Sequence, residues 1–246
     1  MDGEQVRTQS MELVVSRWSE DLRWLRRVPL SIHVTIYNKG EELDPELIAL
    51  LSDRCKISFL GLENIGREAH SYLTHLITRY DNLPALMVFC QGHPFDHAPD
   101  FHDRLRALDS EEESIDRFRW YGFLDETDDP QGKRLFVPWS KNPERLELET
   151  GRLFRELFGE DSPEWFYFRG GAQFAVTREA VRTRPREFYQ RALDLCLSIP
   201  LAAHSYERIW DRIFGAPAIN PADLGPSGVR YLKRIRRLEM RDQEPS

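Results

Sequence analysis

The sequence is poor in the features that mark disulfide-rich, membrane-spanning and secreted proteins. It has three cysteines, Cys55, Cys90 and Cys196, too scattered for a disulfide framework or for shared metal-ligand spacing. No apolar run approaches the ~20 residues that a membrane span needs. The polar residues 1–10 lack the apolar core of a signal peptide. We therefore expect reduced, buried thiols and a cytoplasmic protein.

Positive charge is also in short supply. The chain has 34 Lys and Arg against 41 Asp and Glu, a net charge of −7, which argues against nucleic acid as the partner of the whole protein. Residues 229–240 are the exception, since five of them are basic. A solvated terminal helix is the commoner role of such a segment, and contact with nucleic acid or an acidic partner is the alternative.

What the chain does contain is an alternation of strand and helix patterns. With 41% hydrophobic and 30% charged residues it can bury a core. We expect strands at 12–17, 30–37, 57–60, 86–91, 119–124 and 171–177, and helices at 19–26, 45–53, 67–80, 146–158, 187–197 and 206–214, with a short one after 177. The pattern predicts an α/β domain over 11–215, mostly parallel sheet with helices on both faces. A disordered tail, 1–10, precedes it, and a Pro/Gly linker with a basic tail, 216–246, follows.

Polar residues gather where predicted strands end, the usual place for a site in such a sheet. Asn64, Gly66 and Arg67 begin a helix after the third strand. Free backbone N–H groups and the helix dipole there favour a phosphate, and Arg67 could grip the same anion. The alternative is a plain Asn/Gly turn with a solvated arginine.

A second cluster follows the fourth strand. His93, Asp96 and His97, with Asp100, His102 and Asp103 just beyond, could hold a divalent cation. Imidazole ligands suit zinc or iron, whereas carboxylates suit magnesium or manganese. The alternative is a surface helix over 99–108, in which the later three side chains need no ligand.

Two further places could carry chemistry. Gly170 and Gly171 lead into a strand, where glycines either admit a ligand close to the backbone or simply make a turn. Glu207 is expected at the start of a helix, either as a general base or as a first-turn acid that stabilises the helix.

Several blocks of the sequence, which include Asn64, Gly170 and Glu207, resemble a little-characterised family of fungal and bacterial proteins, a domain of unknown function. The blocks are 14–17 with 20–24, 37–40, 64–72, 80–84 with 88–92, and 170–178 with 206–210. Together they span nearly all of residues 12–215.

A second resemblance is to nucleotide-sugar glycosyltransferases of the GT-A (Rossmann-like) fold. Residues 64–68 are similar to the Asn-x-Gly-Arg-Asp block of polysaccharide-building enzymes. Residues 171–178 are similar to the Gly-Ser-Gln-x-x-x-Leu-x-Arg block of branching N-acetylglucosaminyltransferases. The resemblance implies a nucleotide-sugar donor and Glu207 as catalytic base. It implies donor contacts from Arg17, Asn64, Gly66, Arg67, Gln91, Gly92, Gly170, Gly171, Gln173 and Arg208.

One departure from the glycosyltransferase pattern matters. The metal-binding Asp-x-Asp that usually ends the fourth strand is replaced by Gln91-Gly92-His93. Either Asp96 and His97 hold the metal (manganese or magnesium, or zinc with histidine ligands), or basic side chains neutralise the diphosphate, or no sugar is transferred.

We expect an inverting-type glycosyltransferase-like protein with an unknown acceptor. The alternatives are a metal-dependent hydrolase built on His93, Asp96 and His97, and a non-catalytic module that binds a nucleotide or glycan.

Overall fold

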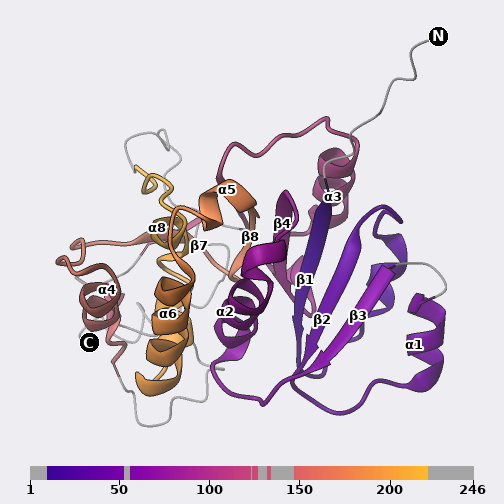
Figure 1. Cartoon of the computed structure of the whole chain (residues 1–246), viewed down its shortest axis with the longest axis horizontal. Coiled ribbons are helices and arrows are strands. Elements are labelled where there is room, and N and C mark those ends of the chain that lie inside the picture. Colours follow the sequence, from indigo (N-terminus) through magenta and orange to yellow (C-terminus); the bar gives the residue numbers. More distant parts are fainter. Residues whose placement is uncertain (1–9, 53–55, 123, 127–131, 134–146, 221–246) are drawn as a thin grey trace, which may run out of the picture.

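The computed structural model describes residues 10–52, 56–122, 124–126, 132–133 and 147–220 (Figure 1). Most of the expected tails 1–10 and 216–246, namely residues 1–9 and 221–246 with the basic segment 229–240, lie outside these residues, as does Cys55. Among the described residues no helix is long and apolar enough to cross a membrane.

Six of the described strands form one sheet in the order β3-β2-β1-β4-β8-β5. β3 (Lys56–Gly61), β2 (His33–Asn38), β1 (Met11–Arg17) and β4 (Leu86–Gln91) run parallel. β8 (Gln173–Thr177) is antiparallel to β4, and β5 (Phe118–Tyr121) is antiparallel to β8. A smaller sheet pairs β6 (Leu124–Glu126) with β7 (Tyr167–Arg169). The predicted α/β class with a mostly parallel sheet is confirmed.

Both faces of the central strands are buried. Every residue of β1 is buried, which explains its apolar run of Leu13, Val14 and Val15. Because side chains alternate along a strand, Val14 enters one hydrophobic cluster while Leu13 and Val15 enter the other. A sheet with two buried faces needs helices on both.

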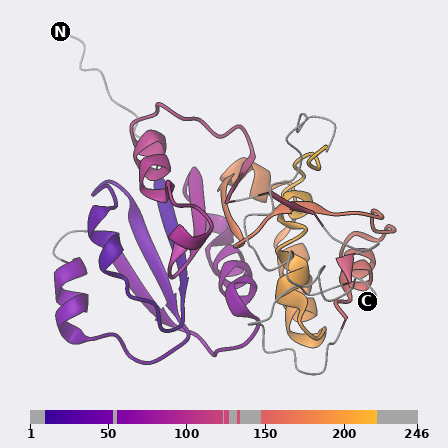
Figure 2. The ribbon, with the colours of Figure 1, turned by 180° about the vertical axis from the view of Figure 1, so that it is seen from behind.

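The helices divide between those two clusters. One face carries α2 (Arg67–Arg79), α4 (Thr150–Phe158), α5 (Arg178–Val181), α6 (Arg186–Ser198), α7 (Ala202–Tyr206) and α8 (Trp210–Ile213). The other carries the 3₁₀ helix η1 (Arg23–Arg27), α1 (Pro45–Ser52) and α3 (Phe101–Asp109). Short 3₁₀ turns η2 (Tyr80–Asn82) and η3 (Pro94–Asp96) flank β4. Seen from behind, η1 and α3 lie over the sheet (Figure 2).

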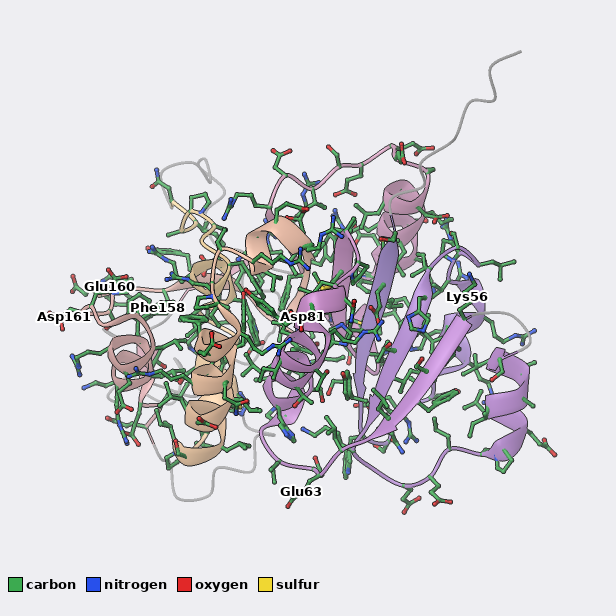
Figure 3. The ribbon with its side chains drawn as sticks, viewed as in Figure 1. Lys56, Glu63, Asp81, Phe158, Glu160 and Asp161 are labelled. Carbon is green, nitrogen blue, oxygen red and sulfur yellow. The ribbon has the colours of Figure 1, made fainter. Side chains whose placement is uncertain are left out.

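The strand order creates a topological switch point at the carboxyl ends of β1 and β4. The chain moves outward from β1 through β2 to β3 and then returns to place β4 on the other side of β1. Ser16 of β1 is paired with Gln91 of β4 near these ends. Ligands of open α/β sheets bind outside the carboxyl ends of the strands at such a point. Figure 3 labels a residue at each end of β3: Lys56 at its start, and Glu63 just beyond its carboxyl end.

Three expected elements differ from the structure. β2 begins at His33, and Leu30 is 66% exposed in the turn before it. The helix expected at 19–26 is the shorter η1, which starts after Leu22. The helix expected at 206–214 is two helices, so the placement of Glu207 at a helix start is wrong: Glu207 ends α7. The small residues Ala202 and Ala203 extend that helix upstream, and Ile209 leaves the helical region with a φ of −128°.

Candidate functional site

The candidate site lies at the carboxyl ends of β1 to β4, where the loops after these strands meet the turn that enters β8. Its residues come from the ends of β1 and β4, the loop after β2, the start of α2, the Gly170-Gly171 turn and the end of α7. These segments are far apart in sequence and are joined by the contacts described below.

Arg17 ties two of the loops together. Its Nη1 donates to Asn38 Oδ1 at 2.6 Å and to the Glu41 carbonyl at 3.0 Å, while its Nε donates to the Glu20 carbonyl at 3.1 Å. The side chain is only 9% exposed. Arg17 therefore shapes the loops after β1 and β2, a structural role beside the expected donor contact.

The start of α2 has the geometry of an anion site. Gly66 precedes the helix with a φ of +59°, and a Cβ there would lie 2.9 Å from His70 Cβ and 3.1 Å from Cys196 Sγ. Glycine is thus required by backbone conformation and by packing against α6. Asn64 and Arg67 are exposed beside it, and the 13-residue helix presents its N-terminal amides at the same end.

Lys39 holds the start of α2 through hydrogen bonds to its backbone. Its ammonium donates to the carbonyls of Ile65 and Arg67, and the side chain is buried. Burial lowers the Lys39 pKa to about 8, although Glu68 opposes the shift. Lys39 was not among the expected site residues, despite lying in one of the family-like blocks.

Glu68 is a second unexpected member of the site. It is buried in the first turn of α2, with Oε2 3.5 Å from Arg67 Nε. Burial raises the pKa of Glu68, Arg67 counteracts this, and the carboxylate of Glu207 raises it further. Glu68 and Glu207 are therefore within electrostatic reach of each other.

Glu207 reaches the site from the end of α7. It is half-buried, and its Oε1 accepts a hydrogen bond of 2.5 Å from the backbone N–H of Gly171. Gly171 has a φ of +96°, so the turn before β8 holds this N–H in a conformation that favours glycine. The structure thus brings together Glu207 and Gly171, both expected site residues.

Arg208 and His204 lie on either side of the α7 end that carries Glu207. Arg208 is buried, its Nη1 donates to the His204 carbonyl, and its guanidinium lies 4.9 Å from the centre of the Phe168 ring. Burial, with smaller contributions from Arg67 and Arg208, lowers the His204 pKa to about 3. His204 is therefore neutral at physiological pH, and both arginines lie within electrostatic reach of it.

Gln91, Gly92 and Gln173 stand at the switch point. A Cβ on Gly92 would lie 2.6 Å from Glu20 Oε2, and the Gly92 carbonyl accepts from Trp24 Nε1 at 2.8 Å. Gln91 is half-buried at the end of β4. Gln173 is fully buried and donates to the Pro94 carbonyl at 3.0 Å. Gly92 and Gln173 therefore have contacts that fix the loop after β4.

The glycine pair admits a histidine to the same turn. A Cβ on Gly171 would lie 2.5 Å from His97 Cγ, so the His97 ring packs directly on this backbone. The Gly170 carbonyl lies 2.6 Å from the position of a Cβ on Gly122. The close approach expected at Gly170 and Gly171 is thus made, within the described residues, by the protein's own chain.

The expected metal ligands do not form a ligand set. His93 Nε2 and Asp96 Oδ1 are 3.9 Å apart, with side chains 51% and 76% exposed. His97 packs instead on Gly171. Across the described part of the chain, no three His, Cys, Asp or Glu side chains gather as metal ligands would. These residues do not fit a divalent cation.

The next three candidates have partners of their own. Asp100 pairs with Arg104 at 2.9 Å, and Asp103 pairs with Arg106. His102 is buried, with Nε2 3.1 Å from the Trp24 carbonyl. The surface helix that was the alternative for this stretch is present as α3.

Solved structures similar to this chain share little sequence with it. The structure of HddC from Yersinia pseudotuberculosis matches with 11% identity and a TM-score of 0.29, covering 72% of this chain and 80% of that chain. HddC complexed with GMP-PN matches with 10% identity and a TM-score of 0.31, covering 71% and 80%. Mouse xyloside xylosyltransferase 1, apo form, matches with 12% identity and a TM-score of 0.36, covering 86% and 85%. TM-scores this low assign no reaction to this chain.

The sequence comparisons point to a family. No curated protein matches the sequence significantly. One family model matches residues 13–223, which is most of the chain and all of the candidate site. The chain therefore belongs to the family described as "Protein of unknown function (DUF3431)".

Proposed function

We propose that this protein transfers a sugar from a nucleotide-sugar donor to a hydroxyl group of an acceptor, with the donor at the carboxyl ends of β1 to β4. The observation that carries the proposal is the position of Glu207, whose carboxylate is held by Gly171 at the same edge as the basic start of α2. A base and an anion site at one switch point are what such a transfer needs.

The start of α2 is the proposed site for the donor diphosphate. Its exposed Arg67 and Asn64, together with the N-terminal amides of the helix, can donate hydrogen bonds to phosphate oxygens. Lys39 holds this loop in place through two carbonyls and adds positive charge beneath it. The same groups stabilise the negative charge that grows on the leaving diphosphate.

Glu207 is the proposed general base. As the acceptor oxygen bonds to the anomeric carbon of the donor, the bond from that carbon to the diphosphate oxygen breaks. The acceptor proton passes to the Glu207 carboxylate, and the nucleoside diphosphate leaves with the bonding electrons. A single displacement of this kind inverts the anomeric configuration. No step is assigned to a metal, because the described residues do not gather a ligand set.

One observation favours a second candidate, a module that binds a nucleotide or glycan without turnover. Glu207 Oε1 already accepts a hydrogen bond from Gly171, so this oxygen is engaged by the protein itself. The two functions agree on donor binding and differ only on whether the donor is consumed.

The deciding experiment combines thermal melting with product detection. Full-length protein is melted against UDP, GDP and CDP and then incubated with the sugar nucleotides of the base that binds. A ligand at ~100 times its Kd adds ~2.7 kcal/mol of stability, which is easily measured as a shift in Tm. Transfer predicts release of the nucleoside diphosphate, and the binding module predicts the shift without release.

Glu207→Gln tests the base. We expect the variant to keep the Tm shift and to lose the release of nucleoside diphosphate, because the amide cannot accept the acceptor proton. Glu187→Gln, an exposed first-turn acid of α6, is the matched control. Undiminished release in Glu207→Gln would remove the assignment.

A further inference from the structure

A separate pocket of about 440 Å³ opens along the edge strand β5. Its walls include three arginines, one each from α3, β5 and β7, and the aromatic side chains of Trp120 and Tyr121. Its volume falls in the ~300–1,000 Å³ range of small-molecule sites. None of the residues expected to bind a donor or a metal lines it.

Two of the three arginines have carboxylate partners. Arg104 pairs with Asp100 at 2.9 Å, and Arg119 pairs with Glu113. Arg169 has no carboxylate partner among the described residues. The Arg169 Nη1 donates to the Gly122 carbonyl at 2.8 Å. Burial lowers the pKa of Arg169, and the nearby charge of Arg104 adds to this effect. The pocket therefore holds one positive charge that the described residues do not neutralise.

Three of the lining residues also carry buried donor atoms behind the pocket wall. Arg104 Nε, Trp120 Nε1 and the Tyr121 hydroxyl are buried and have no hydrogen-bond partner in the described part of the chain. Tyr121 is 1% exposed, with the Arg104 guanidinium 5.3 Å from its ring centre. These atoms lie beneath the pocket surface, so the group that can contact an anion in the pocket is the guanidinium of the half-buried Arg169.

The remaining wall is apolar. Phe118, Pro217 and Ile219 line the pocket beside the Trp120 ring. A cation that faces apolar and aromatic surface matches a ligand with one anionic group and one hydrophobic or planar part.

We propose that this pocket binds a small organic anion, with its carboxylate or phosphate group on Arg169 and its hydrocarbon part against Trp120. The pocket is independent of the proposed sugar transfer, because none of its lining residues belongs to the proposed donor site. It lies close to the candidate site all the same, because Arg169 stands two residues before Gly171 and is bonded to Gly122, which packs against Gly170.

Isothermal titration of the full chain with phenyl phosphate and with benzoate tests the proposal, with benzyl alcohol as the uncharged probe. We expect at least one of the two anions to bind with one-to-one stoichiometry, and we expect benzyl alcohol not to bind. The tighter of the two anions identifies phosphate or carboxylate as the recognised group. Binding of neither anion would overturn the proposal.

Substitutions then locate the site. We expect Arg169→Gln to weaken binding of the preferred anion at least tenfold, because it removes the unneutralised charge. Arg169→Lys, which keeps the charge and loses the paired donors of the guanidinium, should weaken binding about threefold. Arg169→Lys keeps the test decisive if Arg169→Gln fails to fold.

Two control variants complete the design. Arg155→Gln removes the same charge from α4, where Arg155 pairs with Asp161 at 3.2 Å, and should leave the affinity unchanged. Arg67→Gln alters the start of α2 and should also leave it unchanged. Equal affinity in Arg169→Gln and Arg155→Gln would overturn the proposal. A loss in Arg67→Gln alone would do the same, because it would place the anion at the donor site.

Discussion

The carboxylate of Glu207 accepts a hydrogen bond from the backbone N–H of Gly171, 36 positions earlier in the chain. This bond joins the end of α7 to the turn that enters β8, and so places a carboxylate at the switch point of the sheet. The turn can offer its N–H only because Gly171 adopts a φ of +96° and leaves room for the ring of His97.

Gly171→Ala should therefore destabilise the protein. A Cβ would lie 2.5 Å from His97 Cγ, and the positive φ adds backbone strain of ~1–3 kcal/mol. We expect a loss of at least that size in the free energy of unfolding, measured by urea denaturation. Gly61→Ala is the control, since a Cβ there meets nothing within 4 Å and should change stability by no more than ~0.5 kcal/mol. Equal stability of the two variants would contradict the geometry of this turn.

Arg67→Gln should weaken nucleoside diphosphate binding. Arg67 is exposed at the first turn of α2, where a cation and free amides favour phosphate. We expect a tenfold rise in Kd, equivalent to ~1.4 kcal/mol, and a weaker dependence of binding on salt. Isothermal titration at two ionic strengths measures both.

The same helix supplies the control for that experiment. Arg79 is exposed in the last turn of α2, so Arg79→Gln removes an equal charge from the opposite end. Its Kd should stay within a factor of two of the wild type, a margin of ~0.4 kcal/mol. A similar loss in both variants would mean that net charge, and not the start of α2, governs binding.

Much of the fold could be predicted from the sequence because its periodicities are strong. The strands expected at 12–17 and 86–91 and the helix expected at 67–80 follow from the spacing of their apolar residues, and the structure has them as β1, β4 and α2. β7 was missed, since a strand of three residues is too short to show a pattern.

The site was harder to predict because its residues depend on distant packing. Lys39 and Glu68 look like surface charges in sequence, yet both are buried at the start of α2. Glu207 was expected at a helix start because the sequence pattern did not show that a helix already begins at Ala202. His93 and His97 are close in sequence, but a 3₁₀ turn separates them and His97 packs on Gly171.

Asp211→Asn should stabilise the protein at high pH. Asp211 is 3% exposed in α8, and burial raises its pKa from 3.8 to about 7. The folded state therefore binds more protons than the unfolded state between these values, so the wild type loses stability as the pH rises through them. Asparagine keeps the acceptor for the Arg212 N–H, which lies 2.8 Å from Asp211 Oδ1, without the buried charge.

Chemical denaturation at pH 4 and pH 8 tests this linkage. We expect Asp211→Asn to match the wild type at pH 4 and to exceed it at pH 8 by something on the order of 2 kcal/mol. Asp161→Asn, at a side chain 91% exposed, should show no such difference between the two pH values. A wild type that is equally stable relative to Asp211→Asn at both would place the Asp211 pKa near its ordinary value.

Phe174→Ala should be among the most damaging core substitutions. The Phe174 ring lies at the centre of an aromatic cluster, with ring centres at 5.0 Å from Phe89, 5.2 Å from Trp210 and 5.3 Å from Phe118. It therefore joins β4, β5 and α8 through one side chain of β8. Removing it leaves a cavity between the sheet and its helices, at a cost of ~3–5 kcal/mol.

Leu30→Ala is the matched deletion of a large apolar side chain from the surface. Leu30 is 66% exposed, so its removal should cost no more than ~0.5 kcal/mol in the same urea titration. Because Phe174 lies one residue beyond Gln173 in the strand that follows the Gly171 turn, its loss should also disturb the site. We expect the Tm shift produced by the bound nucleoside diphosphate to shrink in Phe174→Ala and to persist in Leu30→Ala. A Phe174→Ala variant as stable as Leu30→Ala would mean that β8 is not held by this cluster.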